Sequence, residues 1–298
     1  MSKILIAIPN ICEGKDKAFI DSLEANLKAV TNLEILDISM DSVRNRTVFA
    51  YTGTFEAIME GGMIIYDKSL QHIDMRKHKG EYPRIGAVDS FPFVPLKGIA
   101  MEEAVAFSNE FAEKVGNTYP IPVYMFSESA KHPLRKFIDD IRKDEYEGLE
   151  EQLKDPRWKP DYGADRFNPD SGATIIGARH PLVSFKILLN TNNAEISKKI
   201  CEAIQYETGG LKHVKSYSGI DESRNQAQIT VSISNYEVTP MYQVIEGIRT
   251  EAKRFGLAIN DVEMIGLIPE RAFLDSAMYY MNINNFSLNN ILETSIQA

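Results

Sequence analysis

Residues 74–86, DMRKHKGEYPRIG, place side chains that can move protons and bind anions in one short stretch. His78, Glu81 and Tyr82 supply an imidazole, a carboxylate and a phenol, and Arg84 supplies a cation suited to carboxylates. If this stretch is extended, His78 and Tyr82 point to the same side, so a relay between them is one interpretation and a structural His78 is another. Glu81 either orients one of these groups or is a surface carboxylate or cap.

Further polar side chains stand next to strand-like segments. Asn10 follows the apolar run of residues 3–8, and Asn45 and Arg46 open another strand-like segment. In α/β proteins, ligands gather beyond the ends of strands. We therefore expect these side chains to join the 74–86 stretch in one site.

The elements that must position these side chains are predicted by the spacing of apolar residues. Helices are indicated by apolar residues three and four apart, and strands by short apolar or alternating runs. Strands are predicted at 3–8, 33–37, 46–51, 121–126, 182–189, 228–233 and 262–268, and helices at 18–30, 53–70, 101–115, 194–206, 241–252 and 269–280. This alternation predicts a fold of the α/β (α+β) class.

Residues 142–180 interrupt the alternation. A charged helix is predicted first, and prolines and glycines then favour a long loop, which Trp158 and its aromatic neighbours indicate to be ordered. We expect the chain to form two subdomains, residues 1–178 and 179–298.

Composition argues against several classes of function. The formal net charge of −9 disfavours a nucleic-acid partner, and no apolar run is long enough for a membrane span. The sequence has no nucleotide-binding glycine motif, and the spacing of its five histidines predicts no metal site. The only two cysteines, Cys12 and Cys201, fit a reducing cytoplasm. Cys12 is either a nucleophile near a helix N-terminus or a small buried residue.

Together, several stretches resemble the formiminotransferase family, which includes the amino-terminal module of formiminotransferase-cyclodeaminase. They are PNICEGK, NRTVFAYTG, IDMRKHKGEYPRIGAVD, IPVYMF, WKPDYG through SGATIIGAR, NYEVTP and MIGLIPERAFLDSA, in the order and spacing of the family. The resemblance implies two α/β sandwich subdomains whose sheets face each other across a folate-binding cleft or tunnel. It also implies a homodimer. Because the chain ends at Ala298, no cyclodeaminase module is expected.

The resemblance further implies transfer of a formimino group from N-formiminoglutamate to tetrahydrofolate, a co-substrate. The family motif GEHPR carries the catalytic acid/base histidine, and here Tyr82 occupies that position, with His78 and Glu81 beside it. An ordinary tyrosine has a pKa near 10, so only about one in a thousand is phenolate at neutral pH. Ser39 stands where relatives often carry an acid. Two alternatives are an ATP-dependent cyclo-ligase acting on 5-formyltetrahydrofolate and a non-catalytic folate-binding protein.

The resemblance also implies the residues that bind the glutamate derivative and the folate. Arg179 matches the family and is a candidate for the folate carboxylates, whereas Arg166 is specific to this sequence and is either a second candidate or exposed. Either Asp165 or Asp170 is a candidate partner for the pterin nitrogens. The full predicted binding set is Asn10, Asn45, Arg46, Arg84, Gly163, Ala164, Asp165, Arg166, Phe167, Asn168, Pro169, Asp170, Ser171, Gly172 and Arg179.

Overall fold

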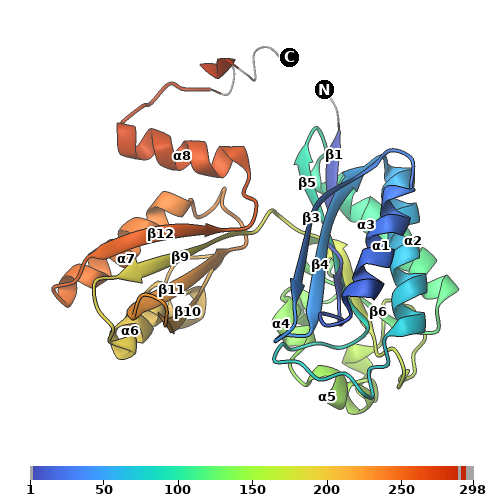
Figure 1. Cartoon of the computed structure of the whole chain (residues 1–298). Coiled ribbons are helices and arrows are strands. Elements are labelled where there is room, and N and C mark those ends of the chain that lie inside the picture. Colours follow the sequence, from blue (N-terminus) through green and yellow to red (C-terminus); the bar gives the residue numbers. More distant parts are fainter. Residues whose placement is uncertain (1–2, 288–289, 293–298) are drawn as a thin grey trace. The chain divides into compact units, whose positions relative to one another are not determined.

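The computed structural model describes residues 3–287 and 290–292. Backbone packing divides the chain into two compact units, residues 1–179 and 180–298. Each unit has its own sheet and its own hydrophobic core (Figure 1). The predicted α/β class is confirmed, because both units combine helices with a sheet.

The first unit contains an eight-stranded sheet. Both β1 and β2 lie between β4 and β5, β3 pairs with the other edge of β4, and the order continues from β5 through β8 and β6 to β7. β8 runs parallel to β5 and β6, and the other pairings are antiparallel. The strands are β1 (Ile4–Ala7), β2 (Asn10–Ile11), β3 (Leu33–Asp41), β4 (Arg46–Gly53), β5 (Val88–Lys97), β6 (Pro122–Met125), β7 (Tyr162–Gly163) and β8 (Thr174–Ala178).

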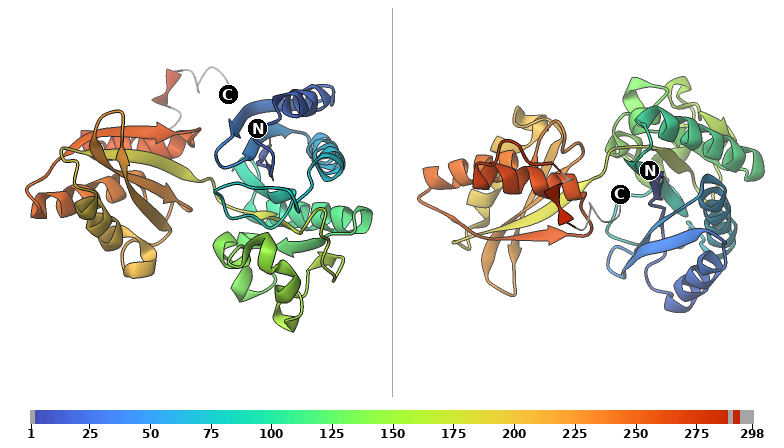
Figure 2. Two further views of the ribbon diagram at one scale, coloured as in Figure 1. Left: turned by 60° about the horizontal axis from the view of Figure 1, so that its bottom comes forward. Right: turned by 90° about the horizontal axis from the view of Figure 1, so that it is seen from above.

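Three long helices cover one face of this sheet (Figure 2). Their buried apolar residues pack against the sheet, and the rings of Phe91 and Phe111 lie 4.6 Å apart between centroids. A smaller core on the other face of β6 and β8 lies beneath two short helices. The helices are α1 (Lys17–Lys28), α2 (Phe55–His72), α3 (Met101–Thr118), α4 (Ile138–Ile141) and α5 (Glu145–Gln152), with short 3-10 turns at Ser127–Ser129, Pro133–Arg135 and Pro156–Trp158.

Strand β5 lies in the middle of the sheet and positions part of the site. It is missing from the sequence-based prediction because Pro92 and Pro95 interrupt its apolar run, and proline argues against a central strand. Asn10 pairs with Ser90 and Ile11 with Val88, so the residue between these partners, Asp89, stands at a β-bulge. Such a bulge re-aims a side chain out of the regular alternation.

The second unit is a four-stranded antiparallel sheet in the order β10-β11-β9-β12, with α6 and α7 packed on one face and α8 beside α7 (Figure 1). The predicted alternation of the 228–233 strand is confirmed, since residues 227, 229, 231 and 233 are buried while those between them are partly exposed. The elements are β9 (Val183–Leu189), α6 (Ala194–Ile204), a 3-10 turn at Tyr206–Thr208, β10 (Val214–Asp221), β11 (Gln226–Ile233), α7 (Met241–Arg254), β12 (Ile259–Ile265) and α8 (Glu270–Met281).

The part of the chain that the structure describes contains no helix with both the length and the apolar character that a membrane span requires.

Candidate active site

The loop between α2 and β5 carries Tyr82, and the neighbouring loop that precedes β8 holds it. The N–H of Met75 donates to the carbonyl of Asp170 (2.8 Å), and the N–H of Ala87 donates to the carbonyl of Ser171 (2.9 Å). A β-bridge also joins residues 86 and 172. The two loops that the sequence predicted to bind substrates are therefore fixed to each other through their backbones.

Tyr82 contacts two arginine side chains. The guanidinium carbon of Arg46 lies 4.1 Å from the centroid of the Tyr82 ring, and that of Arg142 lies 5.3 Å from it. Nη1 of Arg142 donates a hydrogen bond to the phenol oxygen over 3.3 Å. Because a guanidinium can only donate, the phenol oxygen is the acceptor and its own hydrogen is available to another partner.

Arg142 is held by a buried carboxylate. Its side chain is 4% exposed and that of Asp89 is 2% exposed, and Nη2 of Arg142 donates to Oδ2 of Asp89. The same Nη2 donates to the hydroxyl of Ser90 (3.2 Å), and Oδ1 of Asp89 accepts from the N–H of Ile85 (3.0 Å). Burial alone would lower the pKa of Arg142, but Asp89, with a smaller contribution from Tyr82, outweighs it and raises the pKa. Arg142 is therefore a fixed cation.

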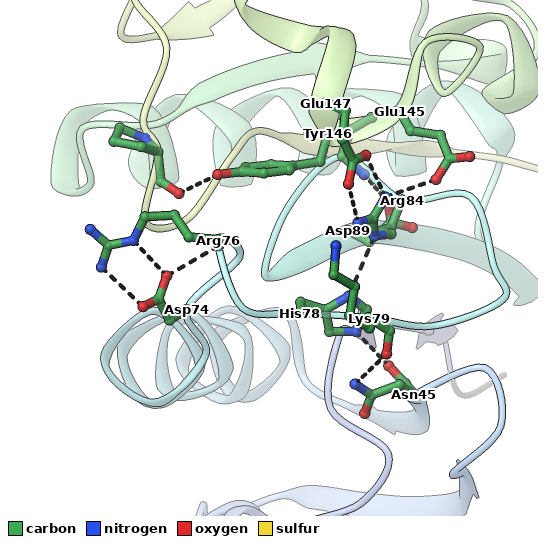
Figure 3. Close-up of polar contacts among 12 residues, drawn as sticks. Asn45, Asp74, Arg76, His78, Lys79, Arg84, Asp89, Glu145, Tyr146 and Glu147 are labelled. Carbon is green, nitrogen blue, oxygen red and sulfur yellow. Dashed lines mark hydrogen bonds and ion pairs between the residues drawn. The ribbon is translucent and has the colours of Figure 1, made fainter.

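Arg46 and Asn45 connect the turn between β3 and β4 to the Tyr82 loop. Arg46 donates to Oδ1 of Asn10, and it forms no ion pair with a carboxylate among residues 3–287 and 290–292. Asn45 has a φ of 49°; its Oδ1 accepts from the N–H of Gly14 (3.0 Å) and its Nδ2 donates to the carbonyl of Lys79 (2.9 Å; Figure 3). Asn45 thus fastens the loop, while Arg46 keeps an unpaired charge beside Tyr82.

Both ring nitrogens of His78 are occupied (Figure 3). Nε2 lies 2.9 Å from the carbonyl oxygen of Asn45, which can only accept, so Nε2 carries the hydrogen. Nδ1 then accepts from Nε of Arg84 (3.4 Å). Burial, together with the Arg84 charge, lowers the pKa of His78, which keeps the imidazole neutral. No hydrogen bond joins His78 to Tyr82 within the described part of the chain.

Arg84 is engaged by two carboxylates at the start of α5. Nη1 lies 2.8 Å from Oε2 of Glu145, and Nη2 lies 2.7 Å from Oε1 of Glu147 (Figure 3). The Glu147 bond raises the pKa of Arg84, and the Arg84 bond lowers the pKa of Glu147. Glu81, by contrast, is exposed and forms no hydrogen bond or ion pair with any residue that the structure describes. Arg84 therefore ties the Tyr82 loop to α5.

Cys12 is buried beneath this cluster, with 3% of its surface exposed. Burial raises the pKa of its thiol well above the ordinary value, and the charge of Asp89 adds to the effect. A thiol this resistant to ionisation is a poor nucleophile. The structure favours the interpretation of Cys12 as a small core residue.

The predicted folate loop, residues 163–172, has two parts with different surroundings. The second part faces the Tyr82 loop: the hydroxyl of Tyr146 donates to the carbonyl of Pro169 (2.6 Å), and Arg76 pairs with Asp170 (3.0 Å). Oδ1 of Asn168 accepts from two backbone N–H groups within this part, and Ser171 and Gly172 are buried.

The first part of that loop, together with Pro169, borders an open depression of about 580 Å³ against α5. Asp165 and Arg166 are exposed in it, and Phe167 packs against Tyr146 with ring centroids 5.5 Å apart. Gly163 adopts a φ of 74° and Ala164 donates its N–H to the carbonyl of Ile121 (3.2 Å). Among the described residues, neither Asp165 nor Arg166 forms a hydrogen bond or an ion pair with Tyr82 or with the two arginines next to it.

The last predicted residue, Arg179, follows β8, and its N–H donates to the carbonyl of Phe93 (2.9 Å).

Within the described residues, no group of three His, Cys, Asp or Glu side chains is arranged to hold a metal ion.

The sequence-based prediction missed Asp89 and Arg142. Asp89 gave a usable signal, because an acid inside the apolar run AVDSFPFV must find a partner once that run is buried. No comparable signal in the sequence pointed to Arg142, because this arginine lies among other charged residues and is 53 positions away from Asp89.

Two family descriptions match this chain. The formiminotransferase domain, N-terminal subdomain, matches residues 4–179, and the formiminotransferase domain matches residues 185–296. The fold and these matches define a formiminotransferase, and the chain belongs to the formiminotransferase family.

Two similar proteins match this chain over nearly their whole length, and a third is about twice as long. The chain is 38% identical over 286 residues to a glutamate formimidoyltransferase of Streptococcus pyogenes serotype M1, with 96% of both chains covered. It is also 38% identical over 292 residues to a glutamate formimidoyltransferase of Thermoplasma acidophilum, covering 97% of this chain and 96% of the relative. A formimidoyltransferase-cyclodeaminase of Rattus norvegicus is 36% identical over 287 residues, and this chain spans 53% of its length.

Proposed function

We propose that this protein is a glutamate formimidoyltransferase, which moves the formimino group of N-formiminoglutamate to N5 of tetrahydrofolate. The observation that carries the proposal is the 38% identity to proteins of that name over 96% of their lengths. The proposal includes subdomains at residues 1–178 and 179–298, a cytoplasmic location and a homodimer. The bacterial and archaeal sources of these relatives support the location.

The reaction exchanges one carbon–nitrogen bond for another. N5 of tetrahydrofolate attacks the formimino carbon, the bond from that carbon to the glutamate nitrogen breaks, and the proton from N5 ends on the departing nitrogen. A positioned group that supplies or relays this proton accelerates the exchange. Binding must also hold both substrates with the donor carbon against N5.

Tyr82 is assigned as the group that donates to the departing nitrogen. Its oxygen already accepts a hydrogen bond from Arg142, so its hydrogen can be donated to a substrate. The phenol therefore begins the reaction protonated, gives its proton to the departing nitrogen, and regains a proton from N5; Arg142 lies beside the phenolate that forms in between. His78 supports the loop through Arg84 and Asn45, and Glu81 is free to orient a substrate.

Arg46 is assigned to a substrate carboxylate because it is the arginine of the Tyr82 cluster without a carboxylate partner. Arg84 and Arg142 are both paired with acids, so Arg84 would have to leave Glu145 and Glu147 to bind a substrate. Asn10, which orients Arg46, and Asn45 complete this side of the site. An unpaired guanidinium attracts an anionic ligand and can bind its carboxylate with two hydrogen bonds.

The folate side of the site is assigned to residues 163–172 and Arg179. Their support is the family match over residues 4–179 and the backbone bonds that join this loop to the Tyr82 loop. Folate is assigned as a co-substrate, and no metal is assigned a part in the reaction.

The test is a direct transfer assay. Purified protein is incubated with N-formiminoglutamate and tetrahydrofolate, and mass spectrometry follows the formimino-folate and glutamate products. Matched reactions omit one substrate or use Tyr82→Phe. We expect equal amounts of both products from wild type and a loss of about 10²-fold or more in Tyr82→Phe. Turnover of 5-formyltetrahydrofolate only with Mg-ATP, or folate binding without turnover, would contradict the proposal and select one of the alternatives.

A further inference from the structure

We infer that Arg142 is a positioning residue for Tyr82: held by the buried carboxylate of Asp89, it fixes the phenol so that the phenol hydrogen is left for a substrate. The kinetic consequence of this inference rests on the proposed function. The structural consequence, a fixed phenol, does not.

The contacts of Arg142 leave it little freedom. Nη2 bonds to Asp89 and Ser90, and Nη1 reaches the phenol of Tyr82. Nε is buried and has no hydrogen-bond partner in the described part of the chain. A planar guanidinium with one end fixed by a carboxylate presents its remaining donors in a set direction. The direction of the Nη1 bond is therefore set by the Asp89 pair.

The position of Asp89 is itself set by the backbone. The bulge in β5 takes Asp89 out of the strand alternation, and the N–H of Ile85 binds its second oxygen. The order of support runs from the bulge to Asp89, from Asp89 to Arg142, and from Arg142 to Tyr82. The side chains of Asp89 and Arg142 are buried, and the side chain of Tyr82 is half-buried.

The phenol ring also contacts Arg46, whose guanidinium carbon lies 4.1 Å from the ring centroid. Arg46 holds the ring through its face, whereas Arg142 also bonds to its oxygen. Among the described residues, Arg142 is the one that bonds to the phenol oxygen, and that bond directs the phenol hydrogen away from Arg142. Lysine would keep the charge but lose the planar fork that reaches Asp89 and Tyr82 together.

The test compares Arg142→Lys with a matched control, Arg135→Lys. Arg135 is also 4% exposed, its Nη1 lies 2.7 Å from Asp161, whose side chain is 7% exposed, and its guanidinium lies 5.1 Å from the ring of Tyr124. None of its contacts is with Tyr82. Both variants thus disturb a buried arginine–carboxylate pair next to a tyrosine, but only one of them touches the proposed acid.

The first measurement needs no substrate. Protein labelled with ¹³C at the phenol carbon of tyrosine gives one NMR signal for Tyr82, identified by its loss in Tyr82→Phe. We expect Arg142→Lys to move this signal and Arg135→Lys to leave it in place. Ser90→Ala, which removes one acceptor of Arg142, is a milder second variant and should move the signal less. An unmoved signal in both Arg142→Lys and Ser90→Ala overturns the inference, whether or not the protein is active.

The second measurement is kinetic. We expect Arg142→Lys to lower kcat about 10- to 100-fold with KM changed less than about threefold, and Arg135→Lys to change kcat less than about threefold. In a Tyr82→Phe background, Arg142→Lys should cause no further loss, because the two residues act as a unit. Equal losses in the two lysine variants, or additive losses with Tyr82→Phe, overturn the inference. Absence of transfer by wild type refutes the proposed function, and the NMR signal still decides the inference.

Discussion

Replacing Asp89 by asparagine should destabilise the first unit. Asparagine is similar in shape and keeps an oxygen that can accept from the N–H of Ile85, so the change removes mainly the negative charge. That charge is the only carboxylate paired with Arg142 among the residues that the structure describes. The variant therefore leaves the buried guanidinium without its ion-pair partner, and Asp139 remains as the other acid that raises its pKa.

The size of the effect follows from the burial of the pair. With 2% and 4% of their side chains exposed, Asp89 and Arg142 are both out of water, where removing one partner typically costs about 3–5 kcal/mol. Ser90 and Tyr82 remain as acceptors for Arg142, so we expect the lower end, about 3 kcal/mol. For a unit of this size that corresponds to a fall in Tm of about 6–12 °C.

The sole tryptophan makes the assay specific to the first unit. Trp158 packs edge-on to Tyr124, with ring centroids 6.2 Å apart, in the small core beneath α4 and α5. Its fluorescence during urea unfolding reports this unit even if the second unit unfolds separately. Asp21→Asn, which removes an exposed partner of Lys17, is the control and should change the free energy of unfolding by less than about 1 kcal/mol.

A double variant identifies the cause. If the loss comes from an unpaired buried charge, then adding Arg142→Met to Asp89→Asn should recover part of it, because replacing both partners by neutral groups is often nearly neutral. The reasoning is refuted if Asp89→Asn loses less than about 1 kcal/mol, or if the double variant is less stable than Asp89→Asn alone.

Three further results are expected. In Tyr82→His, the two guanidinium groups near the ring disfavour an imidazolium, and the neutral imidazole can take up the proton that N5 releases; the pH profile of kcat/KM should therefore rise through a pKa below the ordinary histidine value of about 6.5, and a midpoint above about 7 would contradict this. Burial, with the Arg84 charge, lowers the pKa of His78, so the unfolded chain binds a proton below pH 6.5 that the folded chain does not; wild type should lose unfolding free energy as the pH falls from 6.5, and His78→Gln should lack this slope. The Arg84 bond lowers the pKa of Glu147 in the folded chain. The stabilisation by Glu147 is therefore present above pH 4.5 and is lost as the pH falls through the lower folded value. If the free energy of unfolding falls equally steeply with acid in wild type and Glu147→Gln, this contribution is excluded.

The sequence predicted the elements whose signal is local. The inward residues of the 241–252 helix, among them Met241, Val244 and Ile248, are all buried, because their spacing follows the helical repeat. The alternating strand at 228–233 was predicted for the same kind of reason. Periodicity is a property of a few consecutive residues, so it can be recognised without knowing which elements the helix or strand packs against.

Strand β5 and the Asp89–Arg142 pair depend on distant partners and could not be predicted in this way. Two prolines remove backbone donors from β5. Even so, β1 pairs with it in antiparallel fashion with a register shift, and β8 pairs with it in parallel fashion. The motif around Tyr82 predicted which loop carries the candidate site. It did not reveal the arginine that bonds to the phenol, because that contact crosses 60 positions of the chain.

The two loops assigned to the two substrates have a fixed spacing. Three backbone hydrogen bonds join them, and a Cβ at Gly86 would overlap the carbonyl oxygen of Ala173 and lie 2.6 Å from that of Ser171. Gly172, with a φ of 67°, fits the same crossing. A side chain at either glycine would therefore push the loops apart. Transfer between two bound substrates depends on the distance between the reacting atoms, and a shift of about 1 Å can cost about 10²-fold in rate. Under the proposed assignment, the loop that binds the acceptor and the loop that carries the acid gain from close glycine packing, because neither can then move without the other.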